Sequence, residues 1–206
     1  FSSSATVYGL PQYLPCDEKH PLKPINPYGR TKLMGEELLR DWVKANKKRS
    51  SIALRYFNPV GADASGKIGE HSKDTPNNLM PYISQVAVGK RDFLKVFGDD
   101  YSTPDGTGVR DFIHVQDLAH AHAVAVQKID NFSDFEIFNI GTGYGVSVKE
   151  IVSEFERQSG KKIKFKIVSR RPGDAPAIWA DVSCATKKLN FTARYSLAEM
   201  CRDHWN

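Results

Sequence analysis

The sequence predicts an α/β fold with parallel strands. Strand-like and helix-like segments alternate along its 206 residues, as they do where helices connect the parallel strands of a sheet. Hydrophobic residues make up 40% of the chain and charged residues 26%, which is typical of globular proteins with a buried core and not of disordered or fibrous ones. No internal repeat or low-complexity tract interrupts the alternation. The length suits one large domain or two unequal lobes.

The N-terminal part of the chain predicts a strand end, a helix and a buried strand. The segment FSSSATVYG at residues 1–9 is typical of a buried strand that runs into a turn. A helix is expected over residues 28–46, because apolar residues recur there at helical spacing with charged residues between them. These apolar residues are Leu33, Met34, Leu38, Leu39, Trp42 and Val43. Residues 51–57 predict a buried strand, which leaves through Asn58 and Pro59 into a loop.

The rest of the chain alternates between loops, helices and strands. Residues 61–78 are rich in Gly, Ser, Asp and Asn without periodicity, so we expect a long functional loop or a crossover to another lobe. A helix over residues 118–128 has Asp117 as its expected N-cap, and a helix over residues 148–159 ends at Gly160. The other expected elements are a short apolar helix at 79–88, a loop at 99–108, a strand at 136–140, a strand near 163–168 and a short helix after Asp181.

Charge, hydropathy and cysteine spacing exclude several classes of protein. Lys and Arg number 29 against 24 for Asp and Glu, a net charge of +5; this permits an acidic ligand, but no nucleic-acid-binding motif accompanies the charge. No apolar stretch approaches the roughly 18–20 residues of a membrane span, and no signal peptide is evident. Cys16, Cys184 and Cys201 are widely spaced without a C-x-x-C pair. We therefore expect no nucleic acid, no membrane, no metal, and a reducing, cytoplasmic environment.

Tyr28 and Lys32 form a Tyr-x-x-x-Lys pattern at the start of the first expected helix. Residues four apart share one face of a helix, so the phenol and the ammonium can point at one site. A nearby cation favours the phenolate, the form in which a tyrosine acts as a general base on a hydroxyl proton. Taken alone, the pair also fits an exposed aromatic residue beside a solvated lysine. The serine-rich segment upstream, with Ser4 and Thr6, adds hydroxyls that can hydrogen-bond to a substrate hydroxyl or to the phenolate.

Together, these residues resemble the short-chain dehydrogenase/reductase family, in its extended, nucleotide-sugar-modifying branch. In that branch a strand-end Ser or Thr, a Tyr and a Lys form the active centre beside a nicotinamide ring. Further segments stand in the order and at about the spacing found in the UDP-glucose 4-epimerase family of this branch. They are RYFNPVGA at 55–62, PNNLMPY at 76–82, FGDDYSTPDGTGVRDFIHVQDLA at 97–119, FNIGTG at 138–143 and RRPGD at 170–174. Nearly the whole chain resembles the later two-thirds of such an enzyme.

The resemblance implies the second half of a Rossmann-like doubly wound parallel sheet and a smaller α/β substrate-binding lobe. Residues 1–60 would be the C-terminal half of an NAD-binding domain, and residues 109–142 would return to its sheet. Residues 61–108 and 143–206 would form the two parts of the lobe. The implied protein partner is a second copy of the chain, in a homodimer whose interface is the apolar helix at residues 32–43.

The activity implied is the NAD-dependent interconversion of UDP-galactose and UDP-glucose in galactose metabolism. The C4 hydroxyl is oxidised to give a 4-keto intermediate, which rotates in its pocket and is reduced on its other face. Tyr28 would be the acid/base on the 4-hydroxyl, Ser4 would orient the 4-oxygen with Thr6 nearby, and Lys32 would bind the nicotinamide ribose. Ser4, Tyr28 and Lys32 would thus also contact the cofactor, and Phe57 would line its nicotinamide pocket.

The residues implied to bind the UDP-sugar lie in or beside the motifs quoted above. They are Asn58, Asn78 and Leu79 on the UDP-sugar, Lys95, Val96 and Phe97 beside the uridine, Arg110 and Arg171 on the diphosphate, and Asp174 on the ribose hydroxyls. An arginine fork suits bidentate phosphate binding, although loop arginines also form surface ion pairs. Ile178 would border the sugar's 2-substituent, where the family has a Tyr that excludes N-acetyl groups or a small residue that admits them. Isoleucine is neither, so acceptance of N-acetyl sugars stays open.

Two alternatives remain open. The chain could belong to another epimerase or to a decarboxylase of the same branch that acts on UDP-glucuronate; a dehydratase is disfavoured because the turn from Ser4 to Thr6 has no carboxylate. The chain could also be a catalytically silent fragment or scaffold, because the family's glycine-rich βαβ unit is not within these 206 residues. That unit supplies the helix N-terminus that binds the pyrophosphate. We therefore expect the isolated chain neither to retain NAD nor to epimerise.

Other notable features are expected to be structural. The segment GTGYG at residues 141–145 resembles a phosphate loop, but Val146 stands where the third glycine is required, so a strand-to-helix turn is expected. The histidines have no metal-ligand spacing, and His114 is expected to hydrogen-bond beside Asp111 and Asp117. The core candidates in this part of the chain are Ile137, Ile140, Ile151, Val152 and Phe155.

Overall fold

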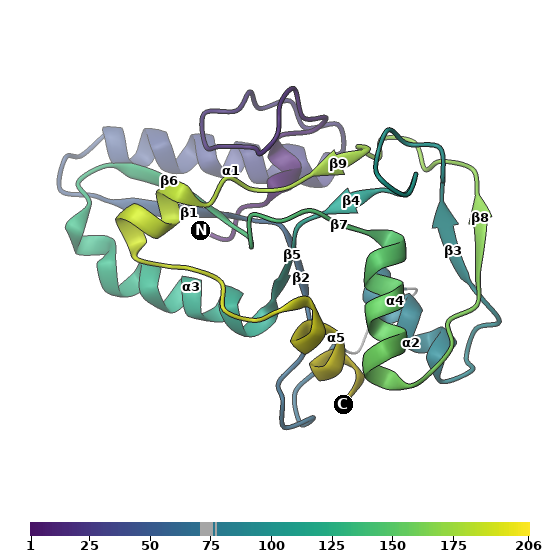
Figure 1. Ribbon diagram of the computed structural model, residues 1–206. Helices are drawn as coiled ribbons and strands as arrows, with labels where there is room; N and C mark the ends of the chain where they lie inside the picture. Colours follow the sequence, from purple (N-terminus) through teal and green to yellow (C-terminus); the bar gives the residue numbers. More distant parts are fainter. Residues whose placement is uncertain (71–75, 77) are drawn as a thin grey trace.

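Helices flank pairs of parallel strands in the computed structural model (Figure 1). The described residues are 1–70, 76 and 78–206. Strands β1 (Ser51–Tyr56) and β6 (Phe135–Ile140) run parallel to each other. Helices α1 (Pro27–Lys44) and α3 (Val115–Lys128) lie on opposite sides of this pair (Figure 1). The predicted α/β class with parallel strands is therefore confirmed.

Strand β1 and the second half of β6 are buried because helices cover both faces of the pair. The first five residues of β1 are buried in succession, which is typical of parallel strands with a helix on each side. Helix α1 begins where the sequence favours it: the Asn26 side chain accepts the N–H of Gly29 at 2.7 Å, and Pro27 occupies the first turn. The first expected helix and the buried strand are thus confirmed.

A second group of strands extends away from this pair. β2 (Asn58–Val60) pairs in parallel with β5 (Phe112–His114), and β3 (Leu94–Phe97) pairs in parallel with β8 (Phe165–Val168). β4 lies between β7, to which it is antiparallel, and β9, to which it is parallel. The bounds of these three are Val109–Arg110 for β4, Val146–Ser147 for β7 and Ala177–Ile178 for β9.

Helices cover this second group of strands, and short helical turns complete the fold (Figure 1). The helices are α2 (Leu79–Ala87), α4 (Val148–Ser159) and α5 (Leu197–Trp205). The turns are the 3-10 turns η1 (Ala5–Val7) and η2 (Ile129–Asn131) and the π-helical turn η3 (Ala185–Leu189). The expected helices near 79–88 and 148–159 are confirmed, and Gly160 ends α4 with a φ of 66°.

Three clusters of buried apolar side chains hold the elements together. One packs α2, α4 and α5 against β2, β3 and β5. Another packs α3 and η3 against β1 and β6, and a third joins η1 to Phe57 and Ala180. Of the core candidates, Ile140, Ile151, Val152 and Phe155 are buried, whereas Ile137 is only partly buried.

The start of α3 differs from the expectation. The helix begins at Val115, and the His114 ring accepts the N–H of Gln116 at 3.0 Å, so His114 and not Asp117 is the N-cap. Asp117 is buried and accepts the N–H groups of Arg194 and Tyr195 at 2.9 and 3.1 Å. Its carboxylate therefore anchors the C-terminal segment, a long-range contact that local sequence does not reveal.

Other segments also differ from the expectation. Asn58 and Pro59 belong to strand β2 and not to a loop, because the chain continues alongside β5. Helix α5 was not expected, although Ser196 and Glu199 form a capping box at its start. The loop expected over residues 61–78 includes residues 71–75 and 77, which lie outside the described residues.

Candidate functional site

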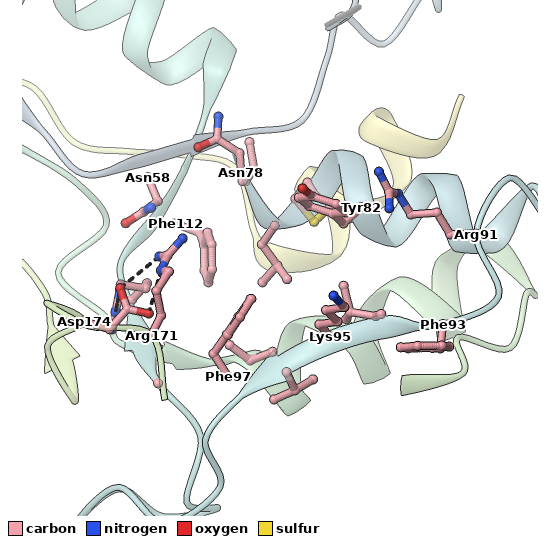
Figure 2. A pocket seen from close by; sticks show the side chains of 18 of the residues that line it. Asn58, Asn78, Tyr82, Arg91, Phe93, Lys95, Phe97, Phe112, Arg171 and Asp174 are labelled. Carbon is pink, nitrogen blue, oxygen red and sulfur yellow. Dashed lines mark hydrogen bonds and ion pairs between the residues drawn. The ribbon is translucent and has the colours of Figure 1, made fainter. Parts of the chain in front are cut away.

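A cavity of about 570 Å³ opens between helix α2 and strand β3 and extends to strands β2 and β4 (Figure 2). Every predicted substrate-binding residue except Ile178 lines it. They are Asn58, Asn78, Leu79, Lys95, Val96, Phe97, Arg110, Arg171 and Asp174. These residues come from segments far apart in the sequence, so the fold brings the predicted set together at one place.

At one end of the cavity, two arginines share a single carboxylate. The Arg171 guanidinium donates to both Asp174 oxygens, at 3.1 and 2.9 Å, and Arg110 Nη2 lies 3.8 Å from Asp174 Oδ1. Burial lowers the pKa of Arg110, whereas the hydrogen bonds that Arg171 donates to Asp174 raise the pKa of Arg171. The two arginines therefore do form ion pairs, and these pairs lie in the wall of the cavity. Because two guanidinium groups face one carboxylate, a net positive charge remains there, which suits an anionic ligand.

Aromatic rings and further cations line the rest of the cavity. Phe97 lies between the Arg171–Asp174 pair and Lys95 (Figure 2), and Leu79 of α2 also lines the cavity. The Arg91 guanidinium is 4.6 Å from the centre of the Tyr82 ring, and the Arg171 guanidinium is 5.7 Å from the Phe97 ring. A ligand with a planar ring and a negatively charged group matches such a lining.

Several lining residues were missed from the sequence. They are Tyr82, Arg91, Phe93, Tyr101 and Phe112. Tyr82 follows Leu79 by three residues on α2, so helical spacing could have found it. Phe112 follows Arg110 by two residues, across the boundary between β4 and β5. Arg91, Phe93 and Tyr101 lie in loops, where no periodicity indicates which side chains face a cavity.

The Tyr and Lys predicted to carry the chemistry lie on α1, and the Ser is the N-cap of η1; none of the three lines this cavity. Lys32 Nζ donates to the Ser2 carbonyl at 2.8 Å and lies 5.4 Å from the centre of the Tyr28 ring. Tyr28 is 49% exposed. Ser4 Oγ accepts the Thr6 N–H at 3.2 Å and the Thr6 hydroxyl at 2.9 Å. The phenol and the ammonium thus share a helix face, and the two hydroxyls are held in one turn.

Gly29 lets α1 pack directly on that turn. A Cβ at residue 29 would lie 2.6 Å from the carbonyl oxygen of Thr6, closer than a side chain can approach. The start of α1, which carries Tyr28, therefore packs directly against the turn that holds Ser4 and Thr6.

Phe57 and Ile178 lie at the boundary between the two groups of residues. Phe57 is buried and packs with η1, and the next residue, Asn58, lines the cavity. Ile178 packs against the same apolar cluster as Phe57, and its strand β9 pairs with Arg110 of β4. The cavity and the Tyr28 region are therefore neighbours, joined by the chain from Phe57 to Asn58 and by the pairing of Ile178 with Arg110.

The glycine-rich segment after β6 is fixed by the buried Asp111. Its carboxylate accepts the Thr142 N–H and hydroxyl at 2.8 and 2.7 Å, and the N–H groups of Gly143 and Ala180 at 3.0 and 3.1 Å. Burial raises the pKa of Asp111 despite these hydrogen bonds. The segment is a turn bound to a carboxylate, which explains why it does not need the glycine spacing of a phosphate loop.

His114 has other partners than those expected. Its Nε2 lies 3.3 Å from Asp203 Oδ2 of α5, and its ring stacks on Tyr195 with centres 4.1 Å apart. The expected neighbours Asp111 and Asp117 bind backbone N–H groups instead. In the described part of the chain, no group of three or more His, Cys, Asp or Glu side chains could hold a metal ion.

A membrane-spanning helix is not found either: none of the helices within the described residues is long and apolar enough to cross a bilayer.

The whole chain is similar to known proteins. The model of a family described as GDP-mannose 4,6 dehydratase matches residues 1–204. UDP-glucose 4-epimerases from Cyamopsis tetragonoloba and Homo sapiens are 56% and 54% identical to the chain over its full length. The chain spans about 59% of the length of these curated relatives.

Solved structures show the same similarity. A UDP-glucose 4-epimerase from Stenotrophomonas maltophila, with bound NAD and formylated UDP-arabinopyranose, matches with a TM-score of 0.97 and 50% identity. One from Bifidobacterium longum, in complex with NAD+ and UDP, matches with a TM-score of 0.94 and 47% identity. Each match covers 100% of this chain and 61% of the other. The predicted Rossmann-like α/β fold class is confirmed by this likeness.

Proposed function

The chain belongs to the GDP-mannose 4,6 dehydratase family, an extended short-chain dehydrogenase/reductase family, and from this premise we propose that it carries the UDP-sugar site and proton-transfer group of a UDP-glucose 4-epimerase. The substrates are UDP-galactose and UDP-glucose, and the cofactor is NAD. The observation that carries the proposal is the cavity in which Arg110 and Arg171 converge on Asp174 beside Phe97. Identity of 54–56% to curated UDP-glucose 4-epimerases over the whole chain supports it.

The cavity binds the nucleotide end of the substrate. Arg110 and Arg171 donate to the diphosphate, because guanidinium forks bind phosphate oxygens in pairs. Asp174 then accepts from the ribose hydroxyls, and Lys95, Val96 and Phe97 flank the uridine. Asn58, Asn78 and Leu79 contact the UDP-sugar between these groups and the reacting carbon. Firm binding at the nucleotide leaves the hexose free to turn over.

Tyr28 removes and returns the proton of the 4-hydroxyl, and Ser4 orients the 4-oxygen. NAD, when bound, supplies the hydride acceptor and donor for C4. The residues present fit its nicotinamide end: the Tyr28 phenol is half exposed, and the Lys32 ammonium has three donors, of which the Ser2 carbonyl takes one. Lys32 therefore binds the nicotinamide ribose hydroxyls, and Phe57 lies at the wall of the nicotinamide pocket.

A second copy of the chain is the proposed protein partner. Met34, Leu38 and Trp42 of α1 are 54%, 72% and 47% exposed, and their spacing of four residues places them on one helix face. This apolar face supports the homodimer that the resemblance implies.

The proposal is tested by joining the chain to the N-terminal segment of a curated relative. We expect that protein to interconvert UDP-galactose and UDP-glucose in a coupled UDP-glucose assay, and to show NAD absorbance after gel filtration. The 206-residue chain, which has no G-x-x-G-x-x-G motif, should bind UDP by calorimetry without retaining NAD. Failure of the 206-residue chain to bind UDP would contradict the proposed site, and NAD retained by it would contradict the expected inactivity.

A further inference from the structure

A buried ion pair joins Glu36 of α1 to Arg55 of β1. Among the described residues, Arg55 of β1 has the largest fully buried side chain. Its Nε and Nη2 donate to Glu36 Oε1 and Oε2 at 2.9 and 2.6 Å, and both side chains are 1% exposed. The pair is bidentate and shielded from water, so its geometry is fixed.

The pair connects α1 to the serine segment. Glu36 follows Lys32 by four residues, so it lies one turn further along the same helix. Its Oε1 also accepts the hydroxyl proton of the buried Ser3. Ser3 is flanked by Ser2, whose carbonyl binds Lys32, and by Ser4, which caps η1. The Glu36 carboxylate therefore connects the helix that holds Tyr28 and Lys32 to the segment that holds Ser4.

Arg55 is itself held from the other side. Its Nη1 donates to the Tyr8 hydroxyl at 3.2 Å and to the Glu18 carbonyl at 3.3 Å. The Tyr8 hydroxyl donates to Asn139 Oδ1 of β6 at 2.6 Å. Burial raises the pKa of Tyr8, so its phenol stays a donor. The hydrogen bonds thus run without a gap from β6 through Arg55 and Glu36 to Ser3.

We propose that Glu36 and Arg55 are positioning residues: they set the register of α1 against the Ser2–Thr6 segment, and so place Tyr28 and Lys32 relative to Ser4. The role of this placement in catalysis rests on the proposed function. A buried ion pair contributes little net stability compared with apolar side chains of the same size, so stability alone does not account for it. Gly29 packs closely on Thr6, so α1 fits against the segment in one position, and a small shift of the helix moves the Tyr28 phenol.

The first test uses the 206-residue chain and does not depend on activity. The double variant Glu36→Met/Arg55→Met removes the pair without leaving an unpaired buried charge, so its melting temperature should lie closer to the parent's than that of Glu36→Gln. We expect the amides of Thr6 and Gly29 to exchange about fivefold faster or more in the double variant, while those of α4 are unchanged.

The matched control is Asp117→Asn, which weakens another buried carboxylate that binds backbone N–H groups far from α1. It should lower the melting temperature without changing exchange at Thr6 and Gly29. If the double variant does not fold, Ser3→Ala removes the Ser3 hydroxyl alone and should give about threefold faster exchange at the same two amides. Unchanged exchange there, in whichever of the two variants folds, would overturn the proposal.

The second test measures turnover in the chain joined to a relative's N-terminal segment. We expect the double variant to lose about tenfold or more in kcat, with KM for UDP-galactose within about twofold of the parent's. Recovery of kcat together with the melting temperature would show that the pair only stabilises the fold. If the unsubstituted protein has no activity, the proposed function is contradicted, and the exchange experiment alone decides the positioning role.

Discussion

The cavity that we propose binds UDP and the Tyr28 region are built in opposite ways. The cavity collects side chains from α2, β2, β3, β4 and the 171–174 segment, and its main charged pair, Arg171 and Asp174, is partly exposed. The Tyr28 region uses two segments close in sequence, and its supporting pair, Glu36 and Arg55, is buried. The side chains that we propose to bind UDP are therefore brought together by the whole fold and are partly exposed, whereas the proposed reacting groups rest on a buried hydrogen-bond network.

This difference predicts that chemistry and binding can be separated by mutation. The largest effect is expected for Tyr28→Phe in the chain joined to a relative's N-terminal segment, where kcat should fall by about 10³-fold or more, because the proton acceptor is lost. UDP affinity of the 206-residue chain, measured by calorimetry, should stay within about twofold, because Tyr28 does not line the cavity. Near-normal turnover would remove Tyr28 from the mechanism, and a large loss of UDP affinity would show that the two regions are not separate.

An intermediate effect is expected for Arg171→Ala. Loss of its charge-assisted hydrogen bonds should weaken UDP binding to the 206-residue chain by about 10- to 100-fold in a calorimetric titration. Arg171→Lys should recover only part of this affinity, because an ammonium lacks the planar fork. The matched control is Arg170→Ala: Arg170 pairs with Asp100 and is not part of the cavity lining, so its loss should leave UDP affinity nearly unchanged. Equal losses of UDP affinity in the two alanine variants would show that UDP binding depends only on the net charge of the chain.

The smallest effect is expected at Ile178, which lies between the two regions. Ile178→Tyr should leave turnover of UDP-galactose within about threefold, because Ile178 is not one of the residues that line the cavity. The substitution should lower the ratio of activity on UDP-N-acetylglucosamine to activity on UDP-glucose, because the tyrosine ring is larger than the isoleucine side chain and fills the space beside the 2-substituent. Competition assays with both sugars measure that ratio, and an unchanged ratio would place the 2-substituent elsewhere.

Much of this arrangement could be predicted from local sequence. The features that could not be predicted mostly depend on contacts between residues far apart in the sequence. The spacing of Leu38 and Trp42 and the glycine at 160 are local signals, and the helices they mark are present. The N-cap of α3 was misplaced because Asp117 is a good local cap, yet it serves residues 194 and 195 instead. The capping box of Ser196 and Glu199 is the local signal for helix α5. In the site, Arg91 and Tyr101 were missed because loop side chains face the cavity only through tertiary packing.

The shared carboxylate at Asp174 also bears on how the cavity responds to salt. A dianionic ligand does not meet two bare guanidiniums there; it replaces a partner that Arg171 and Arg110 already have. The free energy of binding is then a difference between two ion-pair energies, and mobile counterions weaken both of them. A cavity built in this way should lose affinity less steeply with rising ionic strength than one that presents two unpaired cations, and so remain selective for the ligand's shape in concentrated electrolyte.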